Sequence, residues 1–152
     1  MTTEEEPRAD TGRRVTPAEA RDEVRTLLTA HFDSRREGAG GTGARVDTGA
    51  DADVDTEGVA DTVITDALLV TTELITNADR HGGGLTGFRA TAHDGALHLA
   101  VSDRSLEAPE LRPNDLSTLG GFGWPLVHRL CDKVCVEPRD DGKTITVTIL
   151  LG

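Results

Sequence analysis

The stretch "ELITNADRHGGG", residues 73–84, decides the fold. Its first part has the apolar spacing of an amphipathic helix, and the three glycines that follow are typical of a helix end. Glu73, Asn77 and His81 recur in it at intervals of four residues. At about 100° per residue, Glu73 and Asn77 lie roughly 40° apart, along one margin of the apolar stripe. The pattern predicts a helix whose polar margin lies at the rim of the core, between helix and sheet, where a ligand can enter.

The length and charge of the chain set the broad class of protein. Its 152 residues are typical of one domain, and the net charge of −11 disfavours nonspecific binding to nucleic acid or anionic lipid. No run approaches the ~18 apolar residues of a membrane span. The acidic first ten residues lack the order of a signal peptide, and two cysteines make no disulfide framework. We therefore expect a cytoplasmic protein.

The N-terminal half divides into a tail, two helices and a long connection. Residues 1–14 are charged and turn-rich and are expected to be a disordered tail, so that one domain covers 15–152. A helix begins after Thr16, with Pro17 in its first turn and Glu19 completing a capping box. The Gly- and Asp-rich segment at about 33–57 is expected to be a loop insertion.

The C-terminal half alternates hairpins with one helix. The turn Asp94-Gly95 is a hairpin signal between two alternating strands. The order of elements predicts an α+β fold, a two-layer α/β sandwich with about three helices on one face of a mostly antiparallel sheet. The expected elements are helices at 16–32, 58–81 and 123–134 and strands at 86–93, 96–103, 134–138 and 143–151.

Three features carry chemistry, and each is weak alone. The carboxylate of Glu73 and the carboxamide of Asn77 can share a hydrated magnesium ion and its phosphates, or Glu73 can deprotonate an attacking hydroxyl. Asp103 ends a strand, where its carboxylate can accept a hydrogen bond from the amino group of a base. The glycines of "GGFG", residues 120–123, precede a helix whose free N–H groups favour phosphate.

Taken in order, these features resemble a known family. The pattern Glu73-x-x-x-Asn77-Ala78, "VSD" at 101–103 and "GGFGWPLV" at 120–127 are similar to the N, G1 and G2 boxes of the GHKL ATPase superfamily. The spacing and short length are most similar to its anti-sigma-factor serine/threonine kinase branch. The resemblance covers residues 16–150 apart from the insertion, and it implies the Bergerat ATP-binding fold with a mobile lid at 104–120.

The resemblance also implies roles for individual residues. Asn77 would hold magnesium, Glu73 would act as the base and Asp103 would recognise the adenine of ATP. Gly121 and Gly123 would let the backbone approach the phosphates, and His81 would have a supporting role. The implied protein partners are a sigma factor and an anti-sigma-factor antagonist, and the branch implies a homodimer.

One departure opens an alternative. The superfamily's G1 box is Asp-x-Gly-x-Gly, whereas this chain has Ser105 and Glu107 at the two glycine positions. Backbone conformations that only glycine adopts are lost there, which puts catalysis in doubt more than the fold. The alternative is a catalytically degenerate nucleotide-binding adaptor that regulates a partner by binding alone. A freestanding ATP-binding domain of a sensor histidine kinase is a third, weaker reading.

Two metal sites are disfavoured by the sequence. The acidic run that starts at Asp51 has Thr56 and Thr62 where a calcium loop needs glycine and glutamate. His128, Cys131 and Cys135 lack a fourth zinc ligand, and we expect the cysteines to serve the apolar face of the third helix.

Overall fold

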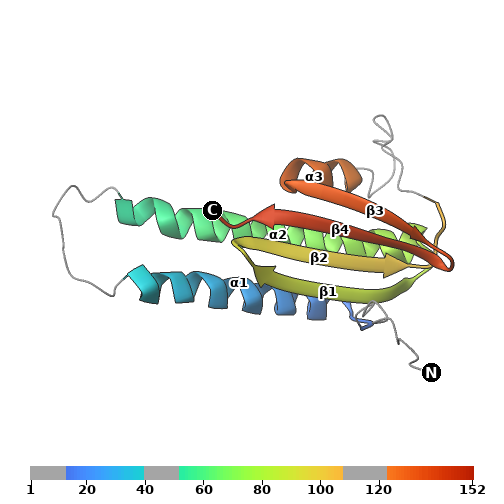
Figure 1. The fold of residues 1–152 in the computed structure, drawn as a ribbon, viewed down its shortest axis with the longest axis horizontal. Coiled ribbons are helices and arrows are strands. Elements are labelled where there is room, and N and C mark those ends of the chain that lie inside the picture. The colour runs from blue at the N-terminus through green and yellow to red at the C-terminus, as the bar shows by residue number, and fades with distance from the viewer. Residues whose placement is uncertain (1–12, 40–51, 108–122) are drawn as a thin grey trace, which may run out of the picture.

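The protein is a two-layer α+β sandwich in which three helices cover one face of a four-stranded antiparallel sheet (Figure 1). The computed structural model describes residues 13–39, 52–107 and 123–152. The predicted fold class is confirmed. The elements are α1 (Pro17–Ala39), α2 (Ala52–His81), β1 (Leu85–His93), β2 (Ala96–Asp103), α3 (Gly123–Leu130), β3 (Lys133–Arg139) and β4 (Gly142–Leu150).

The sheet consists of two hairpins joined through their second strands. The strand order is β1-β2-β4-β3, and every neighbouring pair is antiparallel. In the first hairpin Asp94 and Gly95 both have positive φ, 54° and 71°, as a two-residue type I′ turn requires. The β2–β4 register places Asp103 opposite Lys143. The two hairpins therefore bring the end of β2 beside the start of β4.

The start of α1 has the predicted capping box. The Thr16 N–H donates to the Glu19 carboxylate at 2.7 Å, and the Glu19 N–H donates to the Thr16 hydroxyl at 3.2 Å. The hydrogen bond from the Thr16 backbone N–H, and after it the interaction of the carboxylate with the Thr16 hydroxyl, lower the pKa of Glu19 from its ordinary value of 4.5. Just before the cap, the Arg13 carbonyl accepts a hydrogen bond from the Phe88 N–H at 3.0 Å. Arg13 thus pairs with β1, although the sequence placed it in the tail; residues 1–12 lie outside the described part.

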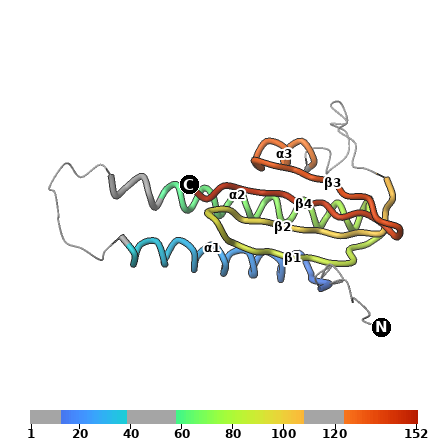
Figure 2. The backbone as a smooth tube through the Cα atoms, in the orientation of Figure 1, coloured from blue at the N-terminus to red at the C-terminus, as the bar shows by residue number. Residues whose placement is uncertain are grey.

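Both long helices extend into the segment predicted as a loop. The first continues to Ala39 and the second begins at Ala52, so residues 33–39 and 52–57 are helical. Residues 33–38 are exposed and include Arg35, Arg36 and Glu37, which are good helix formers that need no apolar stripe. The rest of the predicted insertion, residues 40–51, lies outside the described residues. Figure 2 shows α1 and α2 running beside each other under the sheet.

The third helix is shorter than predicted. It ends at Leu130, whereas the sequence pattern suggested residue 134. The Asp132 N–H donates to the Thr148 carbonyl at 2.9 Å, and the Asp132 carboxylate accepts the Leu150 N–H at 2.7 Å. Asp132 thereby joins the chain to β4, and Cys135 lies in β3 opposite Thr146 instead of on the helix.

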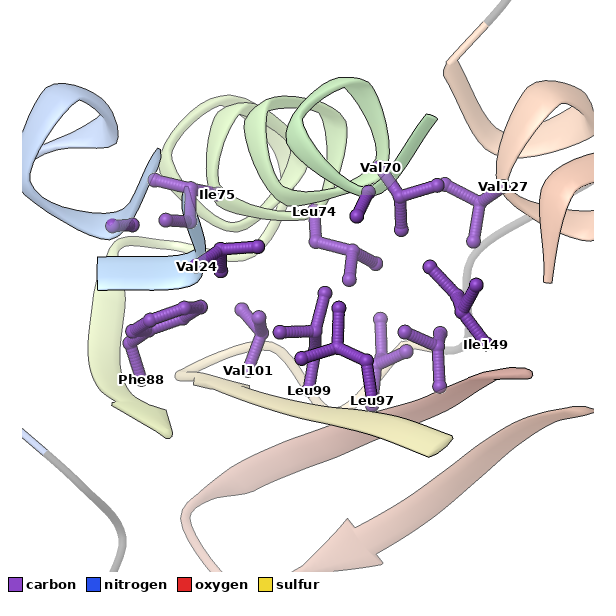
Figure 3. Packing of buried hydrophobic residues seen from close by; sticks show 14 of the residues in the cluster. Val24, Val70, Leu74, Ile75, Phe88, Leu97, Leu99, Val101, Val127 and Ile149 are labelled. Atoms are coloured by element: carbon purple, nitrogen blue, oxygen red, sulfur yellow. The ribbon is translucent and has the colours of Figure 1, made fainter. Parts of the chain in front are cut away.

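One core lies between the helices and the sheet (Figure 3). Alternate residues of β2 and β4 point toward the helices, in agreement with the period of two in a strand. No helix in the described ranges is long and apolar enough to cross a membrane. The largest fully buried apolar side chains are Val24, Leu28, Val70, Leu74, Ile75, Leu97, Leu99, Val101, Val127, Val147 and Leu151.

Candidate functional site

The polar margin predicted for α2 is present. Leu74 and Ala78 are almost fully buried, whereas Glu73 and Asn77 are half-buried one turn apart. Neither of these two polar side chains makes a hydrogen bond or ion pair to another residue in the described parts of the chain. A carboxylate and a carboxamide therefore lie at the rim of the core with oxygens available to a ligand.

The helix α3 packs beside this margin. Val70 of α2 and Val127 of α3 point toward each other in the core (Figure 3). Asn77 follows Val70 by seven residues and so lies on nearly the same side of α2. Because α3 runs antiparallel to α2 (Figure 1), its first turn, which begins at Gly123, lies toward the C-terminal half of α2. The fold thus brings the N-terminus of α3 toward the polar margin.

The glycines after α2 end the helix and carry the chain to β1. The Gly82 and Gly84 N–H groups both donate to the Ala78 carbonyl, at 3.1 Å and 3.0 Å. Gly83 has a φ of 70°, the left-handed conformation common after a helix. His81 is the last helical residue, and it is exposed. Its supporting role stays a prediction.

Asp103 lies at the end of β2, buried against Lys143. The lysine Nζ lies 3.0 Å from Oδ1 and 2.9 Å from Oδ2, and the two side chains are 7% and 3% exposed. The Ser105 N–H also donates to Oδ1, at 2.9 Å. The carboxylate predicted to recognise a base is therefore held in a fixed orientation by two groups of its own chain.

Two glycines leave room for this carboxylate and its backbone. A Cβ on Gly82 would lie 2.5 Å from Oδ2 of Asp103 and 2.7 Å from the Ala78 carbonyl oxygen. A Cβ on Gly142 would lie 2.9 Å from the Asp103 carbonyl carbon. The Gly82 carbonyl in turn accepts the Arg104 N–H at 2.8 Å. The end of β2 is thus joined directly to the end of α2, which carries Asn77.

The chain leaves β2 through turns that need no glycine. The hydrogen bond from the Ser105 N–H to Asp103 is an Asx-turn, and the Glu107 N–H donates to the Ser105 hydroxyl at 3.1 Å in a similar turn. Asp94 is the one non-glycine residue of the described ranges with positive φ, so residues 104–107 avoid the left-handed region. Side-chain turns therefore take the place of the two missing glycines.

Some predicted site features fall outside the described residues. These are Gly121 and most of the lid, residues 108–120. Trp124, in the first turn of α3, is 8% exposed and packs in the core, with its ring 4.8 Å from that of His128.

The histidine and cysteine residues that the structure describes do not form a metal centre. The described residues hold no cluster of three or more His, Cys, Asp or Glu side chains that fits a metal ion. Burial, with a smaller contribution from Asp132, raises the pKa of the Cys131 thiol to about 12. The thiol is therefore protonated, and hence a poor metal ligand, at neutral pH.

Lys143 is the site residue that sequence reasoning missed. A signal was present, because Lys143 shares an alternating strand with Ile145, Val147 and Ile149, whose side chains face the core. A charged residue at an inward strand position needs a buried partner. The partner became evident only from the register of β2 and β4.

Comparison with known proteins agrees with this geometry. Residues 44–149 match the model of the histidine kinase-like ATPase domain, which is well over half of the chain. The chain belongs to the histidine kinase-like ATPase domain family, and it is an ATP-binding, kinase-like ATPase domain of the GHKL type. No curated protein matches the chain.

Similar solved structures are histidine kinases. The histidine kinase domain of the Erythrobacter litoralis EL346 blue-light activated kinase is 23% identical with a TM-score of 0.43, covering 59% of this chain and 48% of that one. The Erythrobacter litoralis EL346 blue-light activated histidine kinase itself is 26% identical with a TM-score of 0.41, and the match covers 60% of this chain and 33% of that one. The Acinetobacter baumannii histidine kinase AdeS is 15% identical with a TM-score of 0.43, and the match covers 87% of this chain and 76% of that one. The chain spans about half the length of the first of these structures.

The residues present fit ATP with magnesium. Glu73 and Asn77 offer oxygen ligands, which magnesium prefers, and these oxygens have no competing partner among the described residues. Asp103 is a buried carboxylate whose Oδ2 has Lys143 as its single polar partner in the described parts of the chain. The first turn of α3 supplies backbone N–H groups of the kind that bind phosphate.

Proposed function

We propose that this chain is an ATP-dependent serine/threonine protein kinase of the anti-sigma-factor type. It phosphorylates a hydroxyl group on a small antagonist protein, and the same domain binds and silences a sigma factor. The observation that carries the proposal is the pair Glu73 and Asn77, half-buried one turn apart on the side of α2 that faces α3. The resemblance of residues 73–82 to that branch supports the choice of substrate class.

Each residue has one task in this proposal. Glu73 accepts the proton of the incoming hydroxyl, and Asn77 holds magnesium by its side-chain oxygen. Asp103 accepts a hydrogen bond from the amino group of adenine, and the N–H groups at the start of α3 face the phosphates. ATP supplies the phosphoryl group, and magnesium offsets the charge that develops on it. The chain contributes by positioning these groups and by removing one proton.

A second candidate function is a nucleotide-binding adaptor that regulates its partner by sequestration alone. The observation that favours it is the pair of side-chain turns after β2, in which Asp103 and Ser105 accept hydrogen bonds from the N–H groups of Ser105 and Glu107. The missing G1 glycines at Ser105 and Glu107 point the same way. This candidate predicts nucleotide binding without phosphate transfer to any protein.

A phosphate-transfer assay separates the two candidates. Wild type and Glu73→Gln are incubated with γ-labelled ATP, magnesium and candidate antagonist proteins, with Glu137→Gln as the control because Glu137 is exposed on β3. We expect Glu73→Gln to bind ATP as wild type does but to transfer phosphate at least ~10²-fold more slowly, because a general base usually contributes that much to the rate. Unchanged transfer in Glu73→Gln contradicts the base role. Binding of ATP by wild type without any transfer favours the adaptor.

The sigma-factor partner needs its own test. Immobilised protein is incubated with a set of purified sigma factors, with and without ATP and magnesium. Retention of one sigma factor in a nucleotide-dependent manner agrees with the proposal. Failure to retain any of them, in either condition, contradicts the sequestration role without bearing on ATP binding.

A further inference from the structure

Lys143 has no role in the proposed chemistry, yet it lies at the centre of the candidate base site. Its ammonium group is buried against both oxygens of Asp103, and both side chains are more than nine-tenths buried. We propose that Lys143 is a positioning residue that aims the Asp103 carboxylate and thereby sets the base preference of the nucleotide site. The inference rests on the proposed role of Asp103 in recognising the base.

The hydrogen bonds of the carboxylate show which oxygen remains for a ligand. Oδ1 accepts from both Lys143 Nζ, at 3.0 Å, and the Ser105 N–H, at 2.9 Å. Oδ2 has Lys143 as its single polar partner among the described residues, at 2.9 Å. Because each carboxylate oxygen accepts about two hydrogen bonds, one acceptor position is left, on Oδ2. That position is suited to one N–H donor of a base, such as the exocyclic amino group of adenine.

The backbone of Gly82 packs closely against Oδ2. Gly82 lies under this oxygen, where a Cβ would come within 2.5 Å of it. The Lys143 ammonium group and the Ser105 N–H together hold the plane of the carboxylate, so that the oxygen away from Ser105 keeps a free acceptor position. The orientation of the acceptor is therefore set before a nucleotide binds.

Stability alone does not explain a lysine at this position. Neighbouring inward positions of β4 are Ile145, Val147 and Ile149, and an apolar side chain at position 143 would continue the core. A buried ion pair commonly adds no net stability over a well-packed apolar pair. A fixed carboxylate orientation is what the lysine gives and an apolar residue does not.

The test compares two nucleotides that differ only in the amino group. Dissociation constants of ATP and of purine riboside triphosphate, which lacks the 6-amino group, are measured for wild type, Lys143→Met and Lys143→Arg. Lys133→Met is the control because Lys133, the other lysine, is exposed on β3. We expect wild type and Lys133→Met to prefer ATP by roughly tenfold or more, the usual effect of one hydrogen bond to a charged group.

We expect Lys143→Met to prefer ATP by only about threefold or less, because a carboxylate that is no longer held in place makes a weaker hydrogen bond to the 6-amino group. If Lys143 had a purely structural role, Lys143→Met would weaken the binding of both nucleotides by the same factor and leave the ratio of their dissociation constants unchanged. That result would overturn the inference. An unselective wild type that binds both nucleotides equally would also overturn it, while ATP binding itself would stand. Failure of wild type to bind either nucleotide overturns the proposed function instead.

Lys143→Arg keeps the positive charge at this position. If the preference for ATP partly returns in Lys143→Arg, the positioning role is supported.

A second comparison applies if Lys143→Met does not fold. Asp103→Asn and the double variant Asp103→Asn/Lys143→Met leave no carboxylate that needs a counter-charge. If Lys143 acts only through Asp103, both variants bind ATP equally and with the same base preference. A further loss of affinity for ATP alone in the double variant would show that Lys143 acts on the base directly and would overturn the inference.

Discussion

Lys143 and Asp103 face each other across β4 and β2, with the lysine Nζ 3.0 Å from Oδ1 and 2.9 Å from Oδ2 of the carboxylate. This contact joins Asp103, a predicted site residue that is nearly fully buried, to a residue that the sequence did not single out. It also ties the site to the ends of α2 and β2, because Gly82 lies under the same carboxylate.

Loss of Lys143 should destabilise the fold. Lys143→Met leaves the Asp103 carboxylate buried without its counter-charge, and removal of one partner of a buried pair costs about 3–5 kcal/mol. We expect a marked decrease in the free energy of unfolding, measured by urea denaturation. The double variant Asp103→Asn/Lys143→Met should recover part of the loss. Two additive single-site losses would show that the two side chains do not depend on each other.

Replacement of Gly82 and of Gly58 by alanine should change the stability of the protein in opposite directions. Gly82→Ala places a Cβ against the Asp103 carboxylate and the Ala78 carbonyl, so we expect a loss of about 1–3 kcal/mol. Gly58 is exposed within α2 with nothing within 4 Å of its Cβ position, and Gly58→Ala should stabilise the helix by ~0.5–1 kcal/mol. Thermal unfolding followed by circular dichroism measures both changes. A stabilised Gly82→Ala would contradict the close approach of Asp103.

The capping box should make α1 sensitive to acid. The lowered pKa of Glu19 means that its contribution to stability is present above the unfolded pKa, about 4.5, and is lost as pH falls through the lower folded pKa. Glu19→Gln should therefore have a lower melting temperature than wild type at pH 7, and the difference between the two melting temperatures should become smaller toward pH 3. A difference that stays constant over this range would argue against an ionised capping carboxylate.

The Cys131 thiol should be unreactive in the native protein. Burial raises its pKa to about 12, so very little thiolate is present at pH 9. We expect alkylation of Cys131 by iodoacetamide to be on the order of a hundredfold slower in the native protein than in guanidinium, as followed by peptide mass spectrometry. Equal rates in the two conditions would mean that the thiol is not buried as described.

Much of the fold could be predicted because local signals agree with it. The capping box at Thr16, the Asp94-Gly95 turn and the alternation in β2 each specify one element, and the structure has all three. The end of α3 could not be predicted, since Cys131 and Val134 continue the apolar spacing of Val127 and Leu130. What ends the helix is the pairing of Asp132 with β4, a contact between residues far apart in the chain.

The candidate site could be predicted only in part. The spacing of Glu73 and Asn77 on a helix is a local property and is present in the structure. The buried contact between Asp103 and Lys143 depends on strand register across 40 residues, which periodicity does not determine. Roles of individual side chains in nucleotide binding remain predictions, and Gly121 lies outside the described residues.

The most direct measurement of the central claim is calorimetric titration of ATP, with and without magnesium, into wild type, Asn77→Ala and Thr65→Ala. Thr65 is exposed on the same helix and serves as the control. We predict that wild type and Thr65→Ala bind ATP in a magnesium-dependent manner and that Asn77→Ala loses this binding. Binding of equal strength in Asn77→Ala, or no binding to wild type at millimolar ATP, would contradict a nucleotide site at this margin of α2.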